Sequence, residues 1–600
     1  MKRLLLSSLI LISTTTCFGQ VVMADILLLY DATVQVNSNG LLFNNYGNGL
    51  PGYETPSLSG NHTLFGASLW VSGLDSDDNL RTAAITFCQE HSGGFCEFYP
   101  GPLTTDGTAS ADPTVFGEYN RIWTISRHQI EAHINYYTCL EDPTCDTDTE
   151  FPGGYYIPIQ INNWPAHGDA DLNLPYNLAP FVDVNGDGVY QPDAGDYPSF
   201  PGDEAIYMIS NDMGVEHLNS LGTPFGIELH TLIYYYHDVH PALSRTIYVH
   251  QDIINRSAND YHDVYMGVWN DFDLGDPLDD YVRTNVKNAY VYVYNGTSFD
   301  GPTYSGPGYG YDLPMMACKI LAGPYKDPNG QDDVGPFGGE EYGDYTKGWN
   351  DGIIDNERLG LSGSIRVNNE TGPMGDPQNA SHFYNYLNST WKNGVSMTYG
   401  ENGYNTDDST LTDAKYIFPG DSDPAFMGTN EVDPNYPFPG GWTEENSAIS
   451  PGDRRILASS GPFSLNAGQK QSIDYVYVFA RQSDDPDSDL HDLLTEYVNI
   501  AANQVDDLPE GVITSVKNVK PEQIGFGLYP NPAASEITIA LPGNTKTSTY
   551  RIFNVLGAKV KSGALKGEQT TIDISGLEPG LYLVNVVVGD KMATQKLVVE

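Results

Sequence analysis

Basic residues are scarce in this chain of 600 residues, because 29 Lys and Arg stand against 78 Asp and Glu, for a formal net charge of −49. A surface this acidic repels nucleic acids and anionic membranes, so the sequence predicts no nucleic-acid partner. The imbalance is confined to residues 1–524, since residues 525–600 carry seven Lys and Arg and six Asp and Glu. Most of the carboxylates serve solubility, and the densest groups of them are candidate ligands for divalent cations.

Long hydrophobic runs are also missing. The apolar segment 4–12 follows Met1-Lys2-Arg3 and is too short to span a bilayer. Together with the Cys17-Phe18-Gly19 exit, it predicts a signal peptide over residues 1–19. Cys17 leaves a lipoprotein as an alternative, although the Thr14-Thr15-Thr16 run before it is a poor lipobox. We expect no transmembrane segment in the mature chain.

Cysteine is sparse, with six residues in all. Beyond Cys17, short loops predict the disulfides Cys88–Cys96 and Cys139–Cys145 and leave Cys318 as a free thiol, although sequence alone does not establish the pairing. Disulfides fit an oxidising, extracytoplasmic destination. Neither pair has the two-residue spacing of a zinc knuckle, so a zinc site is the weaker interpretation.

Familiar catalytic motifs are missing as well. The chain contains no G-x-S-x-G, no H-E-x-x-H, no phosphate-binding loop and no dinucleotide fingerprint. Four histidines lie on or next to predicted strands, but no carboxylate completes a catalytic spacing around His230, His237, His240 and His250. Neutral strand histidines are the simpler interpretation. The sequence therefore does not establish whether the protein is an enzyme, although it favours a non-enzymatic protein.

Alternation of apolar and polar residues dominates what is present. Period-two runs separated by Gly, Pro, Asn and Asp predict an all-β fold with an antiparallel, sandwich-type body, long acidic loops and a few short helices. The expected parts are a β-rich body over 20–320, a second β-rich part over 321–504, a linker over 505–524 and a small β-sandwich over 525–600.

Two segments have the apolar spacing of helices, and one short segment indicates a turn. Residues 122–134 and 487–504 repeat apolar side chains at three- and four-residue intervals, which predicts helices, and the second segment is clearly amphipathic. Gly461-Pro462-Phe463 predicts a turn after a strand over 453–460.

The strongest site motif lies in the loop 183–196. Oxygen ligands at alternate positions followed by Gly are typical of calcium loops. We expect one calcium ion bound by Asp183, Asn185, Asp187, the carbonyl of Val189, and a carboxylate of Asp193 or Asp196. The twelfth position of an EF-hand is Ala194 here and Pro192 opposes an exiting helix, so the motif predicts a loop between strands. An ordinary Asx turn is the alternative.

A second acidic cluster follows a predicted strand that ends at Trp269. It consists of Asp271, Asp273, Asp276, Asp279 and Asp280. So many carboxylates repel one another unless water solvates them or a cation bridges them, which makes the cluster a weaker calcium candidate. The paired acids of a glycoside hydrolase are a more distant interpretation.

The last part of the chain resembles a known family. Leu528-Tyr529-Pro530-Asn531-Pro532, Asn554-Val555-Leu556-Gly557 and Leu577-Glu578-Pro579-Gly580 are similar, in this order, to the C-terminal sorting domain of type IX secretion cargo from the Bacteroidetes. The resemblance covers 525–600 and implies an Ig-like β-sandwich, type IX machinery as a partner, and export through the periplasm to the outer cell surface or the medium. The residues that carry the resemblance are Tyr529, Pro530, Asn531, Pro532, Gly557, Gly580 and Lys596.

The preceding body resembles large uncharacterised secreted Bacteroidetes proteins through LAPFVDVNGDGVYQPDAGDYP, WNDFDLGDPLDD and DRRILASSGPFSL, which implies no activity. One hypothesis is a non-enzymatic, calcium-stabilised surface protein, such as an adhesin, that binds a glycan or a surface protein. The other is a secreted hydrolase of polysaccharide or protein with acids from 169–203 or 271–280. A pocket that holds two such carboxylates beside stacked aromatics favours the hydrolase, whereas carboxylates that converge on one point of a shallow face favour an ion site.

Overall fold

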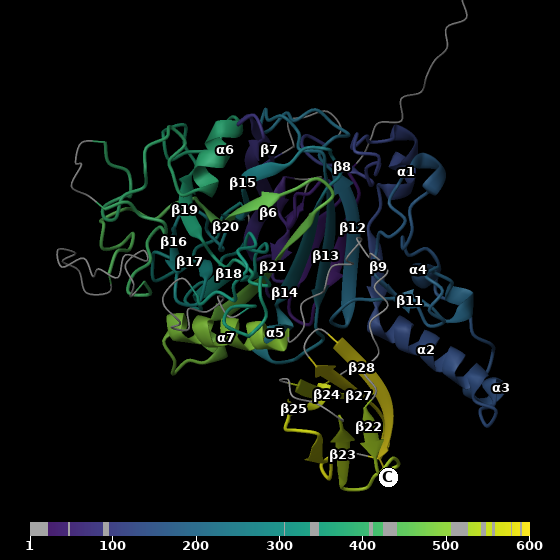
Figure 1. Ribbon diagram of the computed structural model, residues 1–600. Helices are drawn as coiled ribbons and strands as arrows, with labels where there is room; N and C mark the ends of the chain where they lie inside the picture. Colours follow the sequence, from purple (N-terminus) through teal and green to yellow (C-terminus); the bar gives the residue numbers. More distant parts are fainter. Residues whose placement is uncertain are drawn as a thin grey trace, which may run out of the picture. The chain divides into compact units, whose positions relative to one another are not determined.

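The computed structural model describes residues 22–45, 49–87, 95–304, 306–335, 347–406, 412–423, 441–505, 526–541, 548–554, 559–577, 579–588 and 591–599. The chain divides into two compact units, Met1–Val512 and Ile513–Glu600 (Figure 1). The expected signal peptide, and the expected linker after Val505, lie outside the described residues. Within the described ranges, no helix has the length and apolar character needed to cross a membrane.

The first sheet of the larger unit has eight antiparallel strands. Its order is β1-β2-β5-β6-β15-β20-β19, and β7 also pairs with β6. These strands are β1 (Ala24–Leu28), β2 (Thr33–Asn37), β5 (Tyr53–Glu54), β6 (His62–Asp75), β7 (Leu80–Ala84), β15 (Tyr261–Phe272), β19 (Gly363–Asn368) and β20 (Arg454–Leu465). The long strand β15 is central, because β6 pairs with one of its edges and β20 with the other.

The second sheet has nine strands in the order β16-β17-β18-β21-β14-β13-β12-β8, with β9 also paired to β12. These are β8 (Tyr99–Pro100), β9 (Trp123–Ser126), β12 (Glu204–Asn211), β13 (Ile227–Tyr235), β14 (Ile247–Asn255), β16 (Asp280–Asn285), β17 (Tyr290–Asn295), β18 (Pro314–Ala322) and β21 (Lys470–Arg481). Two short hairpins complete the unit: β3 (Asn44–Asn45) with β4 (Leu50–Pro51), and β10 (Phe181–Val182) with β11 (Tyr197–Pro198).

The two sheets bury one hydrophobic core between them. Val268 of the first sheet and Val249 of the second belong to the same buried cluster. The hydroxyl of Tyr477 on β21 donates a hydrogen bond of 2.6 Å to Asn270 Oδ1 on β15, so Asn270 faces the second sheet. Because side chains alternate along a strand, the neighbouring Asp271 lies on the opposite, outer face of the first sheet.

Seven helices are described: α1 (Phe116–Tyr119), α2 (Arg127–Glu141), α3 (Thr147–Glu150), α4 (Ile159–Asn162), α5 (Pro241–Ser244), α6 (Ala380–Leu387) and α7 (Leu490–Gln504). The amphipathic segment 487–504 is confirmed as α7, whose Leu494 and Val498 are buried in one cluster with Val476 of β21. The helix predicted over 122–134 begins later, because Ser126 and Gln129 form a capping box at the start of α2 and the preceding residues extend as β9.

The sequence predicts two β-rich parts that divide at residue 320, but residues on both sides of this position form the same two sheets. Strand β21 pairs with both β14 and β18, and β20 pairs with β15, so both ranges supply strands to the same two sheets. The β20–β21 segment thus joins strands of the two ranges, β20 in the first sheet and β21 in the second. The turn expected at Gly461 is also wrong, since β20 continues through it with a register shift opposite Val264, where a Cβ at 461 would lie 2.7 Å from the Tyr265 ring.

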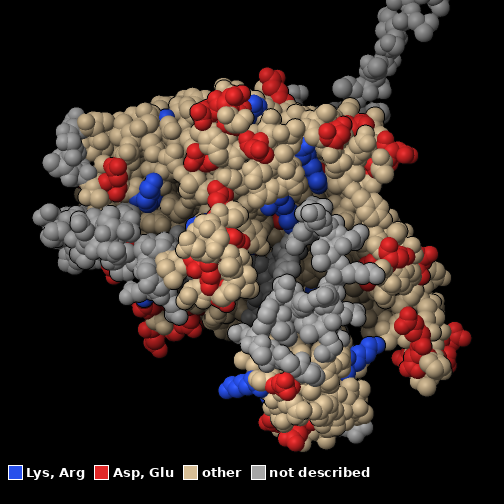
Figure 2. Space-filling view, in the orientation of Figure 1, with Lys and Arg blue, Asp and Glu red and all other residues tan. Residues whose placement is uncertain are grey.

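The smaller unit is a β-sandwich, as predicted. One sheet has the order β22-β23-β26 and the other β25-β24-β27-β28. The strands are β22 (Gly527–Tyr529), β23 (Glu536–Ala540), β24 (Ser548–Asn554), β25 (Lys559–Leu565), β26 (Gln569–Asp573), β27 (Gly580–Val588) and β28 (Lys591–Val599). Ile537 of the first sheet and Ile552 and Val584 of the second share its core. Figure 2 shows acidic side chains in red spread over the visible face of the larger unit.

Candidate functional site

Three carboxylates of the larger unit converge on one point. Oxygen atoms of Asp271, Asp273 and Asp453 all lie within 4.8 Å of one another, and no other group of three His, Cys, Asp or Glu in the described residues meets this condition. Asp271 is near the end of β15, and Asp453 immediately precedes β20. The antiparallel pairing places Asp271 opposite Arg455, which brings the end of one strand beside the start of the other. The sheet register therefore creates the site.

The guanidinium of Arg455 lies among these acids. Its Nε is 3.0 Å from Asp271 Oδ1, and its Nη1 is 3.4 Å from Asp453 Oδ1 and 3.8 Å from Asp376 Oδ1. None of these contacts has hydrogen-bond geometry. Among the described residues, Arg455 Nε and Nη1 and the Oδ1 atoms of Asp271, Asp376 and Asp453 are buried without a hydrogen bond. Buried polar groups almost always have a partner, so this cluster has unused capacity for a ligand.

Asp271 and Asp273 each have a pKa above that of an ordinary carboxyl. Burial raises the pKa of Asp271 well above its usual value; Arg455 opposes this shift, and Asp273 and Asp453 add to it. Burial likewise raises the pKa of Asp273 to about 7, with a further contribution from Asp453. A divalent cation between the carboxylates favours their ionised form and reverses this effect.

The cluster forms the floor of a pocket of about 460 Å³. Ligand pockets typically measure about 300–1,000 Å³. Phe65 and Phe87 line one wall, with their ring centres 5.6 Å apart and edge to face. Arg455 lies 5.8 Å from the centre of the Phe87 ring. Thr86, Asn219, Tyr304 and Asn369 complete the lining.

The remaining acids of the expected 271–280 cluster lie elsewhere. Asp279 accepts hydrogen bonds from Asn295 Nδ2 and Thr297 Oγ1, and Asp276 accepts one from the backbone N–H of Leu278. Asp280 is buried at the start of β16. The carboxylate of Asp300 accepts the backbone N–H of Asp276, which ties this second group together. The five acids therefore divide, and only Asp271 and Asp273 reach the pocket.

The loop 183–196 connects β10 to β11, as predicted for a loop between strands. Its exposed side chains are bonded to its own backbone: Asp183 accepts from Gly186 and Gly188, and Asp187 accepts from Val189. Asn185 accepts from the N–H of Asp187, and the buried Asp196 accepts from Val184 and Gln191. Asp193 lies in the 3-10 turn Pro192–Ala194. Calcium binding by this loop stays a prediction.

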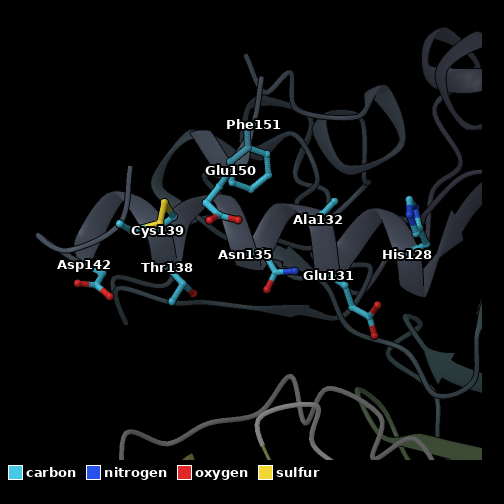
Figure 3. A pocket seen from close by; sticks show the side chains of 10 residues that line it. His128, Glu131, Ala132, Asn135, Thr138, Cys139, Asp142, Glu150 and Phe151 are labelled. Carbon is cyan, nitrogen blue, oxygen red and sulfur yellow. A yellow bond between two sulfur atoms is a disulfide. The ribbon is translucent and has the colours of Figure 1, made fainter. Parts of the chain in front are cut away.

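A second hollow, of about 520 Å³, lies beside α2 (Figure 3). His128, Glu131 and Asn135 line it from α2, and Glu150 and Phe151 line it from the following segment. Its ionisable side chains do not converge as the three pocket acids do. This arrangement makes it the weaker candidate.

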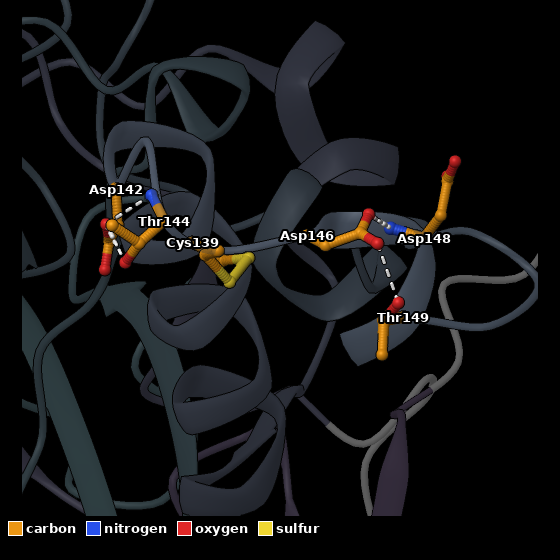
Figure 4. Close-up of a disulfide and its surroundings, with 7 residues drawn as sticks. Cys139, Asp142, Thr144, Asp146, Asp148 and Thr149 are labelled. Atoms are coloured by element: carbon orange, nitrogen blue, oxygen red, sulfur yellow. Dashed lines mark hydrogen bonds between the residues drawn. A yellow bond between two sulfur atoms is a disulfide. The ribbon is translucent and has the colours of Figure 1, made fainter.

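The Cys139–Cys145 disulfide lies beside this hollow and confirms one predicted pair (Figure 4). Its two Cα atoms are 5.2 Å apart. Cys96 is also disulfide-bonded, and Cys88, its expected partner, lies outside the described residues. Cys318 is a buried free thiol, as predicted.

In the smaller unit, Pro530, Asn531 and Pro532 lie between β22 and β23, while Tyr529 ends β22, Gly580 begins β27 and Lys596 is in β28. Asn531 Nδ2 donates to the carbonyl of Lys596 at 2.6 Å, and its Oδ1 accepts the N–H of Val598 at 2.8 Å. The Asn531 amide thus pairs with β28 as a strand neighbour does. Tyr529, Pro530, Pro532, Gly580 and Lys596 are exposed, and Gly557 lies outside the described residues.

Residues 527–600 match the family model described as "Secretion system C-terminal sorting domain". The chain carries a type IX sorting domain. The protein is therefore exported by the type IX secretion machinery, with which its tail interacts, and it reaches the cell surface or the extracellular space through the periplasm.

The solved structures to which the chain is similar include two distant ones. A polysaccharide lyase is 8% identical, with 71% of this chain and 37% of that chain covered and a TM-score of 0.18. A β-glucuronidase from Ruminococcus gnavus is 8% identical, with 27% and 28% covered and a TM-score of 0.11. The chain thus spans well under half the length of either protein, and at these scores the likeness carries no functional argument. No curated protein matches the chain.

Proposed function

We propose that the exported protein is a calcium-dependent binding protein of the cell surface or medium, with one calcium ion held by Asp271, Asp273 and Asp453. The supporting observation is the convergence of these carboxylates within 4.8 Å, with Asp271 Oδ1 buried and free of hydrogen bonds among the described residues. Three oxygen atoms this close can lie about 2.3–2.6 Å from one shared ion, the distance that calcium prefers.

The ligand type favours calcium over other metals. All three side chains offer oxygen, and the described cluster includes no His or Cys, the residues that zinc and copper favour. Calcium takes about 6–8 oxygen ligands and tolerates irregular geometry, so water or a bound molecule in the open pocket can complete its shell. An ion of charge +2 also offsets the repulsion among the acids, which Arg455 alone leaves unbalanced.

Calorimetry with variants tests this site separately from the loop 183–196. We expect calcium to bind the full-length secreted protein, and Asp453→Asn to abolish the heat that belongs to the pocket while retaining the fold. Asp183→Asn is the matched control, because it changes one carboxylate of the other candidate site and leaves the pocket intact. Unchanged calcium binding in Asp453→Asn would refute the proposal.

A hydrolase is the second candidate, and one observation favours it. The pocket places Asp273, whose pKa is raised to about 7, beside Asp453 and below the aromatic pair Phe65 and Phe87. Retaining glycosidases hold two carboxyls roughly 5–5.5 Å apart, one as an acid and one as a nucleophile. Release of new reducing ends from polysaccharide by the wild type, and its loss in Asp273→Asn, would favour this function over binding alone.

A further inference from the structure

An exposed aromatic side chain stands at the rim of the pocket. Tyr304 lines the pocket, yet 77% of its surface is exposed. Its loop is closed at the base by Asp300 and Gly310, whose backbone groups exchange hydrogen bonds of 2.8 and 2.9 Å. The N–H of Thr303 also donates to the carbonyl of Gly306 at 2.9 Å. These contacts hold the loop in place beside the pocket, so the ring is available to a ligand.

The walls of the pocket combine apolar side chains with two amide groups that can each form a further hydrogen bond. Asn219 Oδ1 accepts from the N–H and the hydroxyl of Thr86, at 2.6 and 3.1 Å, which leaves its Nδ2 as a donor. Asn369 Nδ2 donates to Asp453 Oδ2 at 2.8 Å, which leaves its Oδ1 as an acceptor. Phe65 and Phe87 supply the apolar surface. A small-molecule site is typically lined by aromatic and apolar side chains with a small number of polar groups among them.

The charges that line the floor do not favour an anionic ligand. Among the residues that line the pocket, Asp271, Asp273 and Asp453 contribute three negative charges when ionised, and Arg455 contributes one positive charge. A bound calcium ion would bring the net charge of these lining groups to zero. An acidic sugar or an acidic peptide would therefore gain no net electrostatic attraction from the floor. Neutral hydroxyls can bind the ion through their oxygen atoms and donate their protons to carboxylates.

We propose that this pocket binds a neutral saccharide. Two neighbouring hydroxyls of one sugar ring coordinate the calcium ion at the floor, and the C–H face of the ring packs on Tyr304. At the edge of the ring, Asn219 Nδ2 donates a hydrogen bond to one hydroxyl, and Asn369 Oδ1 accepts a hydrogen bond from another. This inference rests on the proposed calcium site and adds the class of ligand to it.

The test compares two tyrosines of one loop. Calorimetry on the full-length protein measures binding of cellohexaose, mannohexaose, xylohexaose and maltohexaose as neutral probes, and of oligogalacturonate as the acidic probe, with calcium and with chelator. We expect calcium-dependent binding of at least one neutral probe, tighter than any binding of the acidic one. Tyr304→Ala should weaken binding by about tenfold or more. Tyr311→Ala is the control, since Tyr311 is 81% exposed and is not among the residues that line the pocket.

The outcomes separate this inference from the function on which it rests. If calcium binds but none of the neutral probes does, or if oligogalacturonate binds more tightly, the ligand class is wrong while the calcium site stands. Equal loss in Tyr304→Ala and Tyr311→Ala would also overturn the inference. If the wild type binds no calcium, the proposed function fails and the inference fails with it. Retained calcium affinity in Tyr304→Ala shows that the variant is folded.

Discussion

Asp280 belongs to the second group of acids and lies at the start of β16. It is fully buried, Oδ2 accepts the N–H of Leu274 at 3.1 Å, and Oδ1 has no hydrogen bond among the described residues. Burial raises its pKa well above the usual value; the Leu274 hydrogen bond opposes the shift, and Asp279 and Asp273 add to it. The folded protein therefore holds this proton to a higher pH than the unfolded chain, which releases it at about pH 3.9.

We expect Asp280→Asn to flatten the pH dependence of stability. The raised pKa contributes stability that is fully present below the unfolded pKa and is lost as the pH rises, by about 1.4 kcal/mol per unit until the folded pKa is reached. The variant removes this loss, so it should gain on the wild type as the pH rises above about 4. Urea unfolding in the presence of chelator, repeated over a range of pH, measures the free energy of unfolding of both proteins. Asp276→Asn is the control, and parallel curves for Asp280→Asn and the wild type would contradict the prediction.

Single residues of the site could be predicted only in part. Asp271 and Asp273 are visible in the sequence as an acidic run, but Asp453 and Arg455 are not, because only the pairing of β15 with β20 brings them near. For the same reason the sequence cannot divide the run 271–280 between the pocket and the group around Asp300. A carboxylate far along the chain has no local signal.

At the scale of elements, the periodicity of apolar residues predicts helices and strands whose formation depends on local sequence. The α7 helix and the strands of the smaller unit follow from apolar spacing, because each buries one face. The partners of β20 and β21 do not follow, because a strand pattern carries no information on which edges meet. Gly461 indicates a turn by composition, yet a bulge within β20 uses the same residue.

The Cys139–Cys145 disulfide should stabilise the end of α2. Closing such a short loop restricts the unfolded chain, which contributes about 2–3 kcal/mol in the chain-entropy model. Replacing both cysteines by serine should lower the local unfolding free energy by up to this amount and accelerate amide hydrogen exchange near residue 139. Cys318→Ala is the control, because its buried thiol lies on β18 in another part of the unit. Unchanged exchange at the end of α2 would show that the disulfide is dispensable there.

At the scale of the whole molecule, the two units have separate tasks. The near-neutral tail carries the sorting domain, and the acidic body carries the pocket. We expect deletion of 525–600 to retain the body in the periplasm, with its fold intact by circular dichroism because each unit has its own core. Cell fractionation measures the distribution, with Asp453→Asn in the full-length protein as the control that still leaves the cell. Normal release of the truncated protein would contradict the assignment of sorting to the tail.

The calcium site is tested most directly by anomalous diffraction from crystals of the protein grown with calcium and then exchanged for a lanthanide, which takes the same oxygen ligands. The proposal predicts a strong anomalous peak between Asp271, Asp273 and Asp453, about 2.3–2.6 Å from an oxygen of each. It also predicts no such peak in Asp453→Asn. A pocket with no peak in the wild type, at a lanthanide concentration that fills any other site in the same crystal, would contradict it.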